Sequence, residues 1–368
     1  MPTDRASLRA RRERAAEAAR AKGVGALLVV PGSDLLYLAG YRIHSSERLT
    51  CLVVDADGAA RLVVPELEAP RARAAAPDLE LRAWSETEDP FAIAATLIPR
   101  TGAIAVDDRM WAAFVLRLQR ALPDRELRPA SEITAPLRSR KESGEIEALR
   151  SVAAAADRTY GRARDAVFLG RSEREVASDL ARLLRDEGHE EVSFTIVASG
   201  PNGASPHHEA GDRRIAAGDA VVLDFGGTRD AYCSDITRTV HVGRGPEPEV
   251  QRVHDVVRRA QEAAYAAAVE GTPASRVDRA ARSVIEEAGY GERFVHRTGH
   301  GIGLDGHEHP YLVAGNDEPL APGMTFSLEP GVYIPGRFGV RIEDIVVLSD
   351  RGTAEPLNEA DRSLAIVA

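Results

Sequence analysis

VVLDFGGTRDAYCSDITRTV, residues 221–240, is the stretch of sequence that decides the fold of the second half of the chain. One short β-type run leads into Asp224, and another continues from Asp235. Between them, Gly226 and Gly227 accept positive φ at little steric cost, which predicts a tight reversal and a hairpin. The hairpin would bring both aspartates to the same end of a sheet. Because two adjacent carboxylates repel each other unless a cation neutralises them or one is protonated, the stretch predicts a cation site.

An internal repeat places two more carboxylates in register with this pair. Two glycine-terminated helical patterns recur at a constant offset of 101 residues. Asp224 corresponds to Glu329 at an offset of 105, and Asp235 corresponds to Glu343 at an offset of 108. Two such halves, each with two helices and an antiparallel sheet, would gather four carboxylates when they face each other. The matched helical positions are Gly170 and Gly271, Val176 and Val277, Leu180 and Ala281, Leu184 and Ile285, and Gly188 and Gly289.

A further candidate ligand lies in residues 294–312, FVHRTGHGIGLDGHEHPYL, where His300 stands among glycines. Four carboxylates and one neutral histidine carry about four negative charges, which two divalent cations would balance. Oxygen-rich ligation with a single imidazole suits Mn²⁺, and also Co²⁺, Fe²⁺ or Zn²⁺. Two such ions lower the pKa of a shared water and polarise a carbonyl, so the set predicts hydrolytic chemistry.

Each of the carboxylates also has a plain structural interpretation. Asp224 and Asp235 could be turn or cap residues, Glu329 could precede a Pro-Gly turn, and Glu343 could pair with Arg341 on a sheet surface. The repeat places all four carboxylates at corresponding positions of its two halves. This correspondence favours the functional interpretation for all four.

The bulk composition limits the class of protein. A chain of 368 residues is about twice a typical single domain, so we expect two domains. The net charge of −10 argues against nucleic acid as a partner. Two widely separated cysteines imply no disulfide framework, which favours the reducing cytoplasm. No apolar run reaches the ~18 residues of a membrane span, and the Arg-rich N-terminus lacks the apolar core of a secretory signal. An organelle transit peptide is the rival interpretation of that N-terminus, and Asp4, Glu13 and Glu17 weaken it.

The first part of the chain alternates between helical and strand patterns, which predicts a compact α/β domain over residues 1–135. A charged junction, LRSRKESGE at 137–145, precedes a long amphipathic helix, so the second domain is expected over 136–368. The first domain contains no cluster of residues with metal-ligand spacing, and we expect a shaping or dimerising role for it. Within it, helices are predicted over 3–22, near 90–98 and over 109–121, and strands over 23–30, 35–38, 50–54 and 61–64.

Four motifs in the second domain resemble the metallopeptidases of the pita-bread fold. They are SDITRT around Asp235, GHGIGL around His300, EPG at Glu329 and RIED at Glu343. The family includes methionine aminopeptidase, aminopeptidase P, prolidase and the metal-free creatinases. The resemblance implies that Asp224 chelates one metal ion, that Asp235 and Glu343 bridge two ions, and that His300 and Glu329 complete the separate shells. Creatinase lacks the complete ligand set, so the intact set disfavours it.

The N-terminal part, with DLLYLAGY at 34–41, is similar to the extra domain of prolidases, aminopeptidases P and creatinases. The resemblance thus implies an α/β (α+β) protein in which an N-terminal α/β domain precedes a pita-bread domain with two pseudo-symmetric halves. Methionine aminopeptidases lack the extra domain, so the Xaa-Pro branch is favoured. That branch cleaves the imide bond before proline, whose nitrogen carries no hydrogen.

In that branch, two further histidines contact the substrate, and His207 and His307 occupy their positions here. The resemblance implies that His307 moves a proton or stabilises the oxyanion, and that Glu329 accepts the proton of the nucleophile. Arg341 either orients Glu343 or reaches the substrate. Some prolidases bind the terminal carboxylate of the dipeptide through an arginine four residues after the second histidine. Tyr311 stands there instead, and Arg337 is a candidate replacement.

The sequence therefore predicts a dinuclear-metal Xaa-Pro dipeptidase, with Mn²⁺ as the expected ion, a substrate with proline at its second position, and a cytoplasmic homodimer. An Xaa-Pro aminopeptidase for longer peptides is the first alternative. A non-peptidase user of the fold, either a creatinase-like hydrolase or a binding module, is the second. The GxGxxG pattern at 301–306 raises a nucleotide-dependent enzyme as a third, but no helical run follows the pattern, as a nucleotide site would require.

Overall fold

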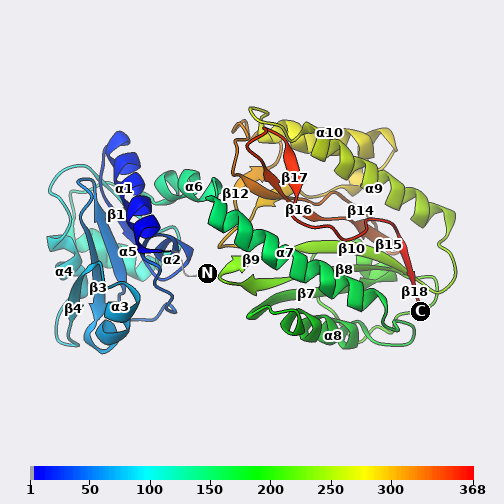
Figure 1. Ribbon diagram of the computed structural model, residues 1–368, viewed down its shortest axis with the longest axis horizontal. Coiled ribbons are helices and arrows are strands. Elements are labelled where there is room, and N and C mark those ends of the chain that lie inside the picture. Colours follow the sequence, from blue (N-terminus) through cyan, green and yellow to red (C-terminus); the bar gives the residue numbers. More distant parts are fainter. Residues whose placement is uncertain (1–3) are drawn as a thin grey trace. The chain divides into compact units, whose positions relative to one another are not determined.

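The computed structural model describes residues 4–368, which divide into two compact units between Arg138 and Ser139. Figure 1 shows both units as mixtures of helices and strands, which agrees with the predicted α/β class.

The first unit is built on a six-stranded mixed sheet with the strand order β4-β3-β2-β1-β5-β6. Strand β2 pairs antiparallel with β1 and with β3, and the other neighbouring strands pair in parallel. Apolar side chains of β1, β2, β3 and β5 fill the core against the helices. The strands are β1 (Val24–Val29), β2 (Cys51–Asp55), β3 (Ala60–Pro65), β4 (Glu80–Trp84), β5 (Ala103–Val106) and β6 (Leu127–Pro129). The helices are α1 (Arg5–Ala21), α2 (Ser33–Ala39), η1 (Glu66–Glu68), α3 (Ala69–Ala75), α4 (Pro90–Thr96), α5 (Ala112–Ala121) and α6 (Ser131–Ser139).

One predicted strand of this unit is wrong. Residues 35–38 belong to helix α2, which ends at Gly40 in the left-handed conformation with φ of 66°. The Gly40 N–H donates to the carbonyl of Leu36, which is a typical glycine helix end. A run of four apolar residues does not distinguish a strand from a buried helix by periodicity, and here the flanking glycine was the informative signal.

The second unit contains two halves, each of which begins with two helices and continues with strands. The first half is α7 (Ser143–Arg164), α8 (Glu173–Asp186), β7 (Glu191–Ser199), η2 (Gly200–Ala204), β8 (Ala220–Arg229), β9 (Tyr232–Cys233) and β10 (Ile236–Val242). The second half is α9 (Pro248–Ala267), α10 (Ala274–Glu287), η3 (Gly291–Arg293), β11 (Gly299–Gly301), β12 (Glu308–Leu312), β13 (Thr325–Leu328), β14 (Gly331–Ile334), β15 (Phe338–Arg341), β16 (Asp344–Leu348), β17 (Ala354–Pro356) and β18 (Ala365–Val367).

The strands of the second unit lie between the helices of the two halves, with α8 on one side and α9 and α10 on the other (Figure 1). One sheet has the order β18-β10-β8-β7, with β9 pairing to β8, and another has the order β12-β11-β13-β16-β17. Strands β14 and β15 form a separate hairpin. An isolated bridge between Thr237 and Glu343 joins the first half to the second.

Matched glycines confirm the internal repeat at the level of the backbone. Gly170 and Gly271, which precede α8 and α10, have φ of 79° and 78°. Gly188 and Gly289, which follow those helices, have φ of 100° and 83°. Because these values favour glycine, the repeat marks equivalent turns in two equivalent folding units. The predicted fold with two pseudo-symmetric halves is correct.

The predicted position of the β8 turn is wrong. Gly226 and Gly227 lie inside β8, and the chain reverses at Asp230 and Ala231, whose φ values are 50° and 74°. The two glycines are needed for close packing, since a Cβ on Gly226 would collide with the carbonyl of Ser234. The pair of aspartates is nevertheless brought together, because Asp224 lies opposite Thr237 in the antiparallel pairing of β8 with β10.

The main chain of η2 in the first half packs directly against the main chain of β15 in the second half. A Cβ on Gly203 would lie 2.9 Å from the amide nitrogen of Gly339, and a Cβ on Gly339 would collide with the carbonyl of Gly203. We call this contact the glycine seam.

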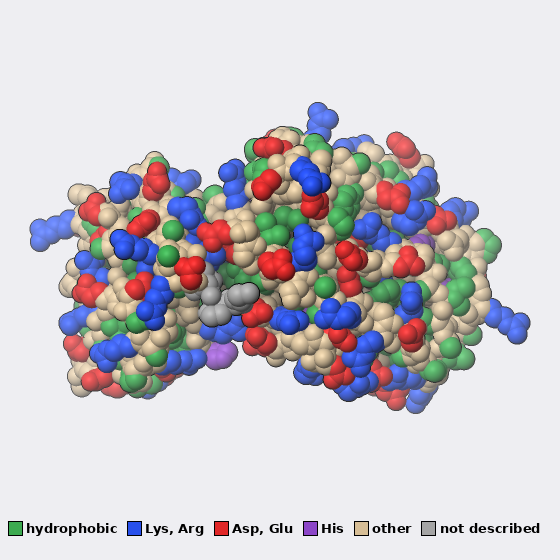
Figure 2. All heavy atoms as spheres, in the orientation of Figure 1, with side chains coloured by type: hydrophobic (Ala, Val, Ile, Leu, Met, Phe, Trp, Pro, Cys, Tyr) green, Lys and Arg blue, Asp and Glu red, His purple; other side chains and the backbone are tan. Residues whose placement is uncertain are grey.

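The surface of the molecule carries charges of both signs. Figure 2 shows acidic and basic side chains interspersed over the face drawn. No helix within residues 4–368 has the length and apolar character needed to cross a membrane.

Candidate metal centre and active site

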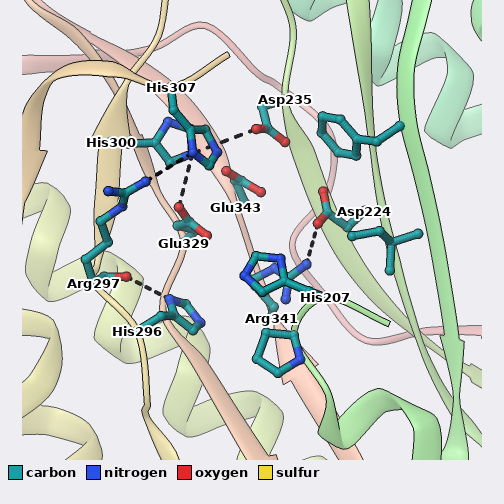
Figure 3. A pocket seen from close by; sticks show the side chains of 13 residues that line it. His207, Asp224, Asp235, His296, Arg297, His300, His307, Glu329, Arg341 and Glu343 are labelled. Atoms are coloured by element: carbon teal, nitrogen blue, oxygen red, sulfur yellow. Dashed lines mark hydrogen bonds and ion pairs between the residues drawn. The ribbon is translucent and has the colours of Figure 1, made fainter. Parts of the chain in front are cut away.

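A cavity of about 680 Å³ in the second unit collects the residues that the sequence singled out. All five predicted metal ligands line it, together with His207, His307 and Arg341 (Figure 3). The remaining lining residues are Phe194, Ile196, Pro206, His296 and Arg297.

Strands from both halves deliver the five predicted ligands. Asp224 lies within β8 and Asp235 directly precedes β10, so the first half contributes both aspartates. His300 lies within β11, Glu329 directly follows β13, and Glu343 lies between β15 and β16. The Glu343 N–H donates to the carbonyl of Thr237 at 3.0 Å, and this bond fixes the second half against β10.

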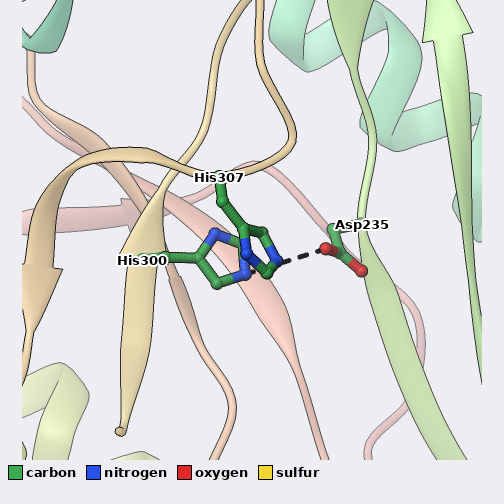
Figure 4. A group of neighbouring side chains, drawn as sticks. All are labelled: Asp235, His300 and His307. Atoms are coloured by element: carbon green, nitrogen blue, oxygen red, sulfur yellow. Dashed lines mark ion pairs between the residues drawn. The ribbon is translucent and has the colours of Figure 1, made fainter. Parts of the chain in front are cut away.

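The side chains of this group lie within ligand distance of one another. His300 Nε2 is 3.2 Å from Glu329 Oε1 and 3.9 Å from Asp235 Oδ2. Figure 4 shows His300 and His307 side by side and facing Asp235, with the two ring centroids 3.8 Å apart. Three sets of donor atoms each lie within 4.8 Å of one another: Asp224, Asp235 and Glu343; His300, Glu329 and Glu343; and Asp235, His300 and His307.

Unsatisfied oxygens show that the donor set fits divalent cations. Asp224 Oδ1, Asp235 Oδ1 and Glu343 Oε1 are buried, and none of them has a hydrogen-bond partner among residues 4–368. Buried carboxylate oxygens without a donor are costly, because the lost hydration is not replaced. Three of them converging beside an imidazole are the hard and borderline donors that a divalent transition metal accepts.

Charge repulsion within the cluster changes the acidity of its members. Burial raises the pKa of Asp235 and of Glu343 well above their usual values, and the charges of neighbouring carboxylates raise both further. Burial also raises the pKa of Asp224, although Arg341 opposes this shift. For Glu329 burial again acts upward, but the hydrogen bond and charge of His300 outweigh it and lower the pKa to about 2. Glu329 therefore stays ionised, while the other three carboxylates resist sharing the site without a cation.

Arg341, at the end of β15 in the second half, is held by residues of both halves. Its guanidinium pairs with Asp224 and donates to Thr237 Oγ1 at 3.1 Å and to the Tyr333 hydroxyl at 2.9 Å. Thr237 Oγ1 in turn donates to Glu343 Oε2 at 2.7 Å. Arg341 therefore orients Asp224 directly and Glu343 through a threonine, and the surface pair of Arg341 with Glu343 is not formed.

Comparison with known proteins places this geometry in a family. A profile described as Metallopeptidase family M24 matches residues 147–350, and one described as Creatinase/Prolidase N-terminal domain matches residues 11–140. The chain belongs to metallopeptidase family M24. It is thus a metal-dependent hydrolase, and the family implies divalent metal ions in the cluster described above.

Three relatives illustrate the range of this M24 branch. A probable dipeptidase PepE of Mycobacterium tuberculosis is 47% identical over 98% of this chain and 97% of its own length. A recombinant prolidase from Thermococcus sibiricus has a TM-score of 0.91 and 40% identity over 97% of this chain and 98% of its own. An X-Pro aminopeptidase from Thermotoga maritima has a TM-score of 0.83 and 33% identity, with 97% and 99% coverage.

The two histidines that are predicted to contact the substrate come from different halves of the unit. His207 lies between β7 and β8 of the first half, and His307 lies between β11 and β12 of the second. Both are exposed toward solvent at the mouth of the cavity. Partial burial, with the neighbouring charges of His300 and Arg297, lowers the pKa of His307 to about 4, so its ring is neutral at pH 7.

Sequence reasoning missed two ionisable residues that line the cavity and proposed a third that lies elsewhere. His296 and Arg297 line the cavity, and His296 Nε2 lies 2.7 Å from the Tyr333 hydroxyl. Both stand in the histidine- and glycine-rich stretch, three and four residues before His300, and that proximity was the available signal. Arg337, the candidate replacement for the missing arginine, pairs with Glu249 and does not line the cavity.

Proposed function

We propose that this M24 metallopeptidase hydrolyses the imide bond of Xaa-Pro dipeptides. The observation that carries the proposal is the cavity in which four carboxylates and His300 converge with three buried oxygens left unsatisfied. The dipeptidase and prolidase names of its relatives support the same class of substrate.

We infer that two divalent ions occupy the cluster, with Mn²⁺ as the preferred species. Asp224 would hold one ion, Asp235 and Glu343 would bridge both, and His300 and Glu329 would complete the shells. When bound, such a pair of ions lowers the pKa of a shared water and polarises the scissile carbonyl. The oxygen-rich donor set supports Mn²⁺ over softer ions, which prefer thiolates.

The protein's own residues divide the remaining work. Glu329 is ionised and lies within the cluster, next to His300, so it is the base that accepts the proton of the attacking water. His307, neutral and next to His300, donates a hydrogen bond to the developing oxyanion or moves the proton onward. His207 reaches the cavity from the opposite half and completes the substrate contacts. Arg341 holds Asp224 in place, and its own contact with substrate stays a prediction.

An Xaa-Pro aminopeptidase for longer peptides is the second candidate function. Tyr311 stands where some prolidases carry the arginine that binds a dipeptide carboxylate, and this favours a longer substrate. A creatinase-like or binding role is the third, and the complete carboxylate set disfavours it. The cytoplasmic location and the homodimer also stay predictions.

A metal analysis with a peptide assay on the same sample tests the proposal. The protein is loaded with Mn²⁺, its metal content is measured, and release of proline from Ala-Pro and of arginine from Arg-Pro-Pro is followed. Turnover of Ala-Pro that a chelator abolishes is the expected result. Faster turnover of Arg-Pro-Pro would favour the aminopeptidase. Turnover of neither peptide by a demonstrably loaded enzyme would contradict both.

A matched variant separates the hydrolase from a metal-independent user of the fold. Asp235→Ala should remove activity toward both peptides because it deletes a bridging carboxylate. Activity or ligand binding that survives this substitution and chelator treatment would favour the third candidate.

A further inference from the structure

Two arginines line the cavity, and their guanidinium groups differ in the number of side-chain partners that they have. Arg341 is buried, and its guanidinium is shared among Asp224, Thr237 and Tyr333. Arg297 is half-buried, and among residues 4–368 no carboxylate oxygen lies within ion-pair distance of it. Its positive charge therefore faces the cavity without a counterion.

The guanidinium of Arg297 is nevertheless held in a defined place. It lies 4.5 Å above the ring centroid of Tyr311, and one of its terminal nitrogens donates to His307 Nδ1 at 3.1 Å. Figure 3 shows Arg297 beside His307 and turned toward the ligand cluster. Stacking on an aromatic face and one hydrogen bond orient a guanidinium while most of its donors stay available.

We propose that Arg297 binds the terminal carboxylate of the dipeptide substrate, which makes it the residue that selects dipeptides. This inference rests on the proposed function. Arginine presents a planar fork that matches a carboxylate in a bidentate manner, and the resulting charge-assisted bonds are about twice as strong as neutral ones.

The reach of a dipeptide agrees with this position. Its carboxylate lies on the residue that follows the scissile carbonyl, and one residue spans about 3.8 Å between Cα atoms. His307 is 3.8 Å from His300 between ring centroids, and Arg297 is in direct contact with His307. The guanidinium thus contacts a side chain that stacks on His300, which places it beside the cluster that would hold the scissile carbonyl.

The charge balance of the cavity leaves this cation available for an anionic group of the substrate. Asp224, Asp235, Glu329 and Glu343 all line the cavity, and two bound divalent ions would balance their four charges. An unpaired arginine at the mouth gives the substrate carboxylate a favourable partner, whereas a longer peptide has an uncharged peptide bond at the same place. Loss of a charge-assisted bond of this kind lowers kcat/KM by roughly 10- to 100-fold.

The experiment compares an acid substrate with its amide on the Mn²⁺-loaded enzyme. Ala-Pro and Ala-Pro amide share the scissile bond and differ only in the terminal charge. Wild-type enzyme should prefer Ala-Pro, Arg297→Met should lose roughly 10- to 100-fold in kcat/KM for Ala-Pro and little for the amide, and Arg297→Lys should lose less. Arg337→Met, which removes an exposed arginine outside the cavity, is the matched control and should leave both rates unchanged.

Other outcomes would overturn the inference. An equal loss for both substrates would mean that Arg297 only positions His307, and no loss for either would mean that it has no role in binding. Metal content and thermal unfolding of each variant verify that the cluster and the fold are intact. If the wild type cleaves neither substrate, the proposed function fails. Calorimetric binding of Ala-Pro and of its amide to wild type and Arg297→Met still decides the role of Arg297.

Discussion

The two halves of the catalytic unit hold their active-site segments by the same device with different side chains. In the first half, buried Glu173 on α8 accepts hydrogen bonds from the side chain and N–H of Ser199, from Asn202, from His208 Nε2 and from the Gly211 N–H. These bonds fix the loop that carries His207. His208, the neighbour of His207, is therefore one of the residues that hold this loop.

In the second half, the corresponding anchor is Asp278 on α10. It accepts from the N–H of Thr298 at 3.0 Å and from its hydroxyl at 2.8 Å, and it pairs with Arg282. Arg282 in turn donates to the carbonyls of Phe294 and His296. In the first half the carboxylate of Glu173 contacts the loop directly at all these groups, and Arg213 adds one hydrogen bond to Ser199 Oγ. In the second half the anchoring carboxylate is itself paired with the arginine that holds the backbone. The repeat thus preserves the place of the anchor, the second helix of each half, and not its identity.

The largest effect is expected at the bridging positions, which correspond across the repeat. Asp235→Asn and Glu343→Gln should each abolish hydrolysis, because each deletes a charge shared by both predicted ions. Both variants should stay folded in the presence of a chelator and be at least as stable as wild type, because each removes a repelling carboxylate. Peptide hydrolysis and thermal unfolding measure the two effects. Unfolding of either variant would show that its carboxylate is needed for packing.

The next largest effect is expected at the anchors, Glu173 and Asp278. Glu173→Ala should lower kcat/KM by about 10²-fold, because the loop that carries His207 loses its fixed position. Asp278→Ala should have a similar effect through the segment that carries His296 and His300. Each leaves buried donors unpaired, which costs about 1–3 kcal/mol per group, so the melting temperature should fall. Steady-state kinetics with metal analysis tests the comparison. A loss of metal in Glu173→Ala would contradict a purely loop-holding role.

Removal of the buried ion pair beneath the loop of the second half should lower activity less than the anchor variants do, and it should lower stability measurably. Lys141 Nζ lies 2.7 Å from Glu308 Oε1, next to His307, and both side chains are buried. Lys141→Met should destabilise the unit by about 3–5 kcal/mol, because it removes the cation that faces a buried carboxylate. The double variant Lys141→Met with Glu308→Leu should recover much of that loss. Denaturant unfolding measures both, and equal losses in the two variants would contradict the pairing.

The smallest effect concerns pH and separates the metal-free state from the loaded state. The pKa values of Asp235 and Glu343 are raised on folding, so their contribution to stability is present below their unfolded values of 3.8 and 4.5 and is lost as pH rises. The melting temperature of the chelator-treated protein should therefore fall by several degrees between pH 5 and pH 8. Mn²⁺ should remove this slope. A slope that is unchanged in Asp235→Asn would assign it to other groups.

The sequence was sufficient to find the parts of the site that depend on spacing. The offsets that relate Asp224 to Glu329 and Asp235 to Glu343 are visible in one dimension, and the structure brings these four residues together. Their roles as ligands stay predictions. Contacts made across the fold were not readable, because Arg297 meets Tyr311 only after β11 and β12 pair.

The two wrong local predictions share a physical cause. A short apolar run at 35–38 and a glycine pair in β8 were interpreted from local preference, yet tertiary packing decided both. Leu35 and Leu38 are buried on a helix, and the glycine pair makes room for neighbouring backbone. Glycine in a strand therefore marked close approach and not a turn.

The glycine seam between Gly203 and Gly339 has a practical consequence for anyone who reshapes this enzyme. Because each position faces main-chain atoms of the other, even alanine would force the two halves apart on the side from which His207 enters. Libraries aimed at new peptide substrates should vary Phe194, Ile196 and Arg297 and leave the two glycines untouched. Variation at the seam would change the separation of the halves. The cavity-lining residues that come from opposite halves would then all change their relative positions.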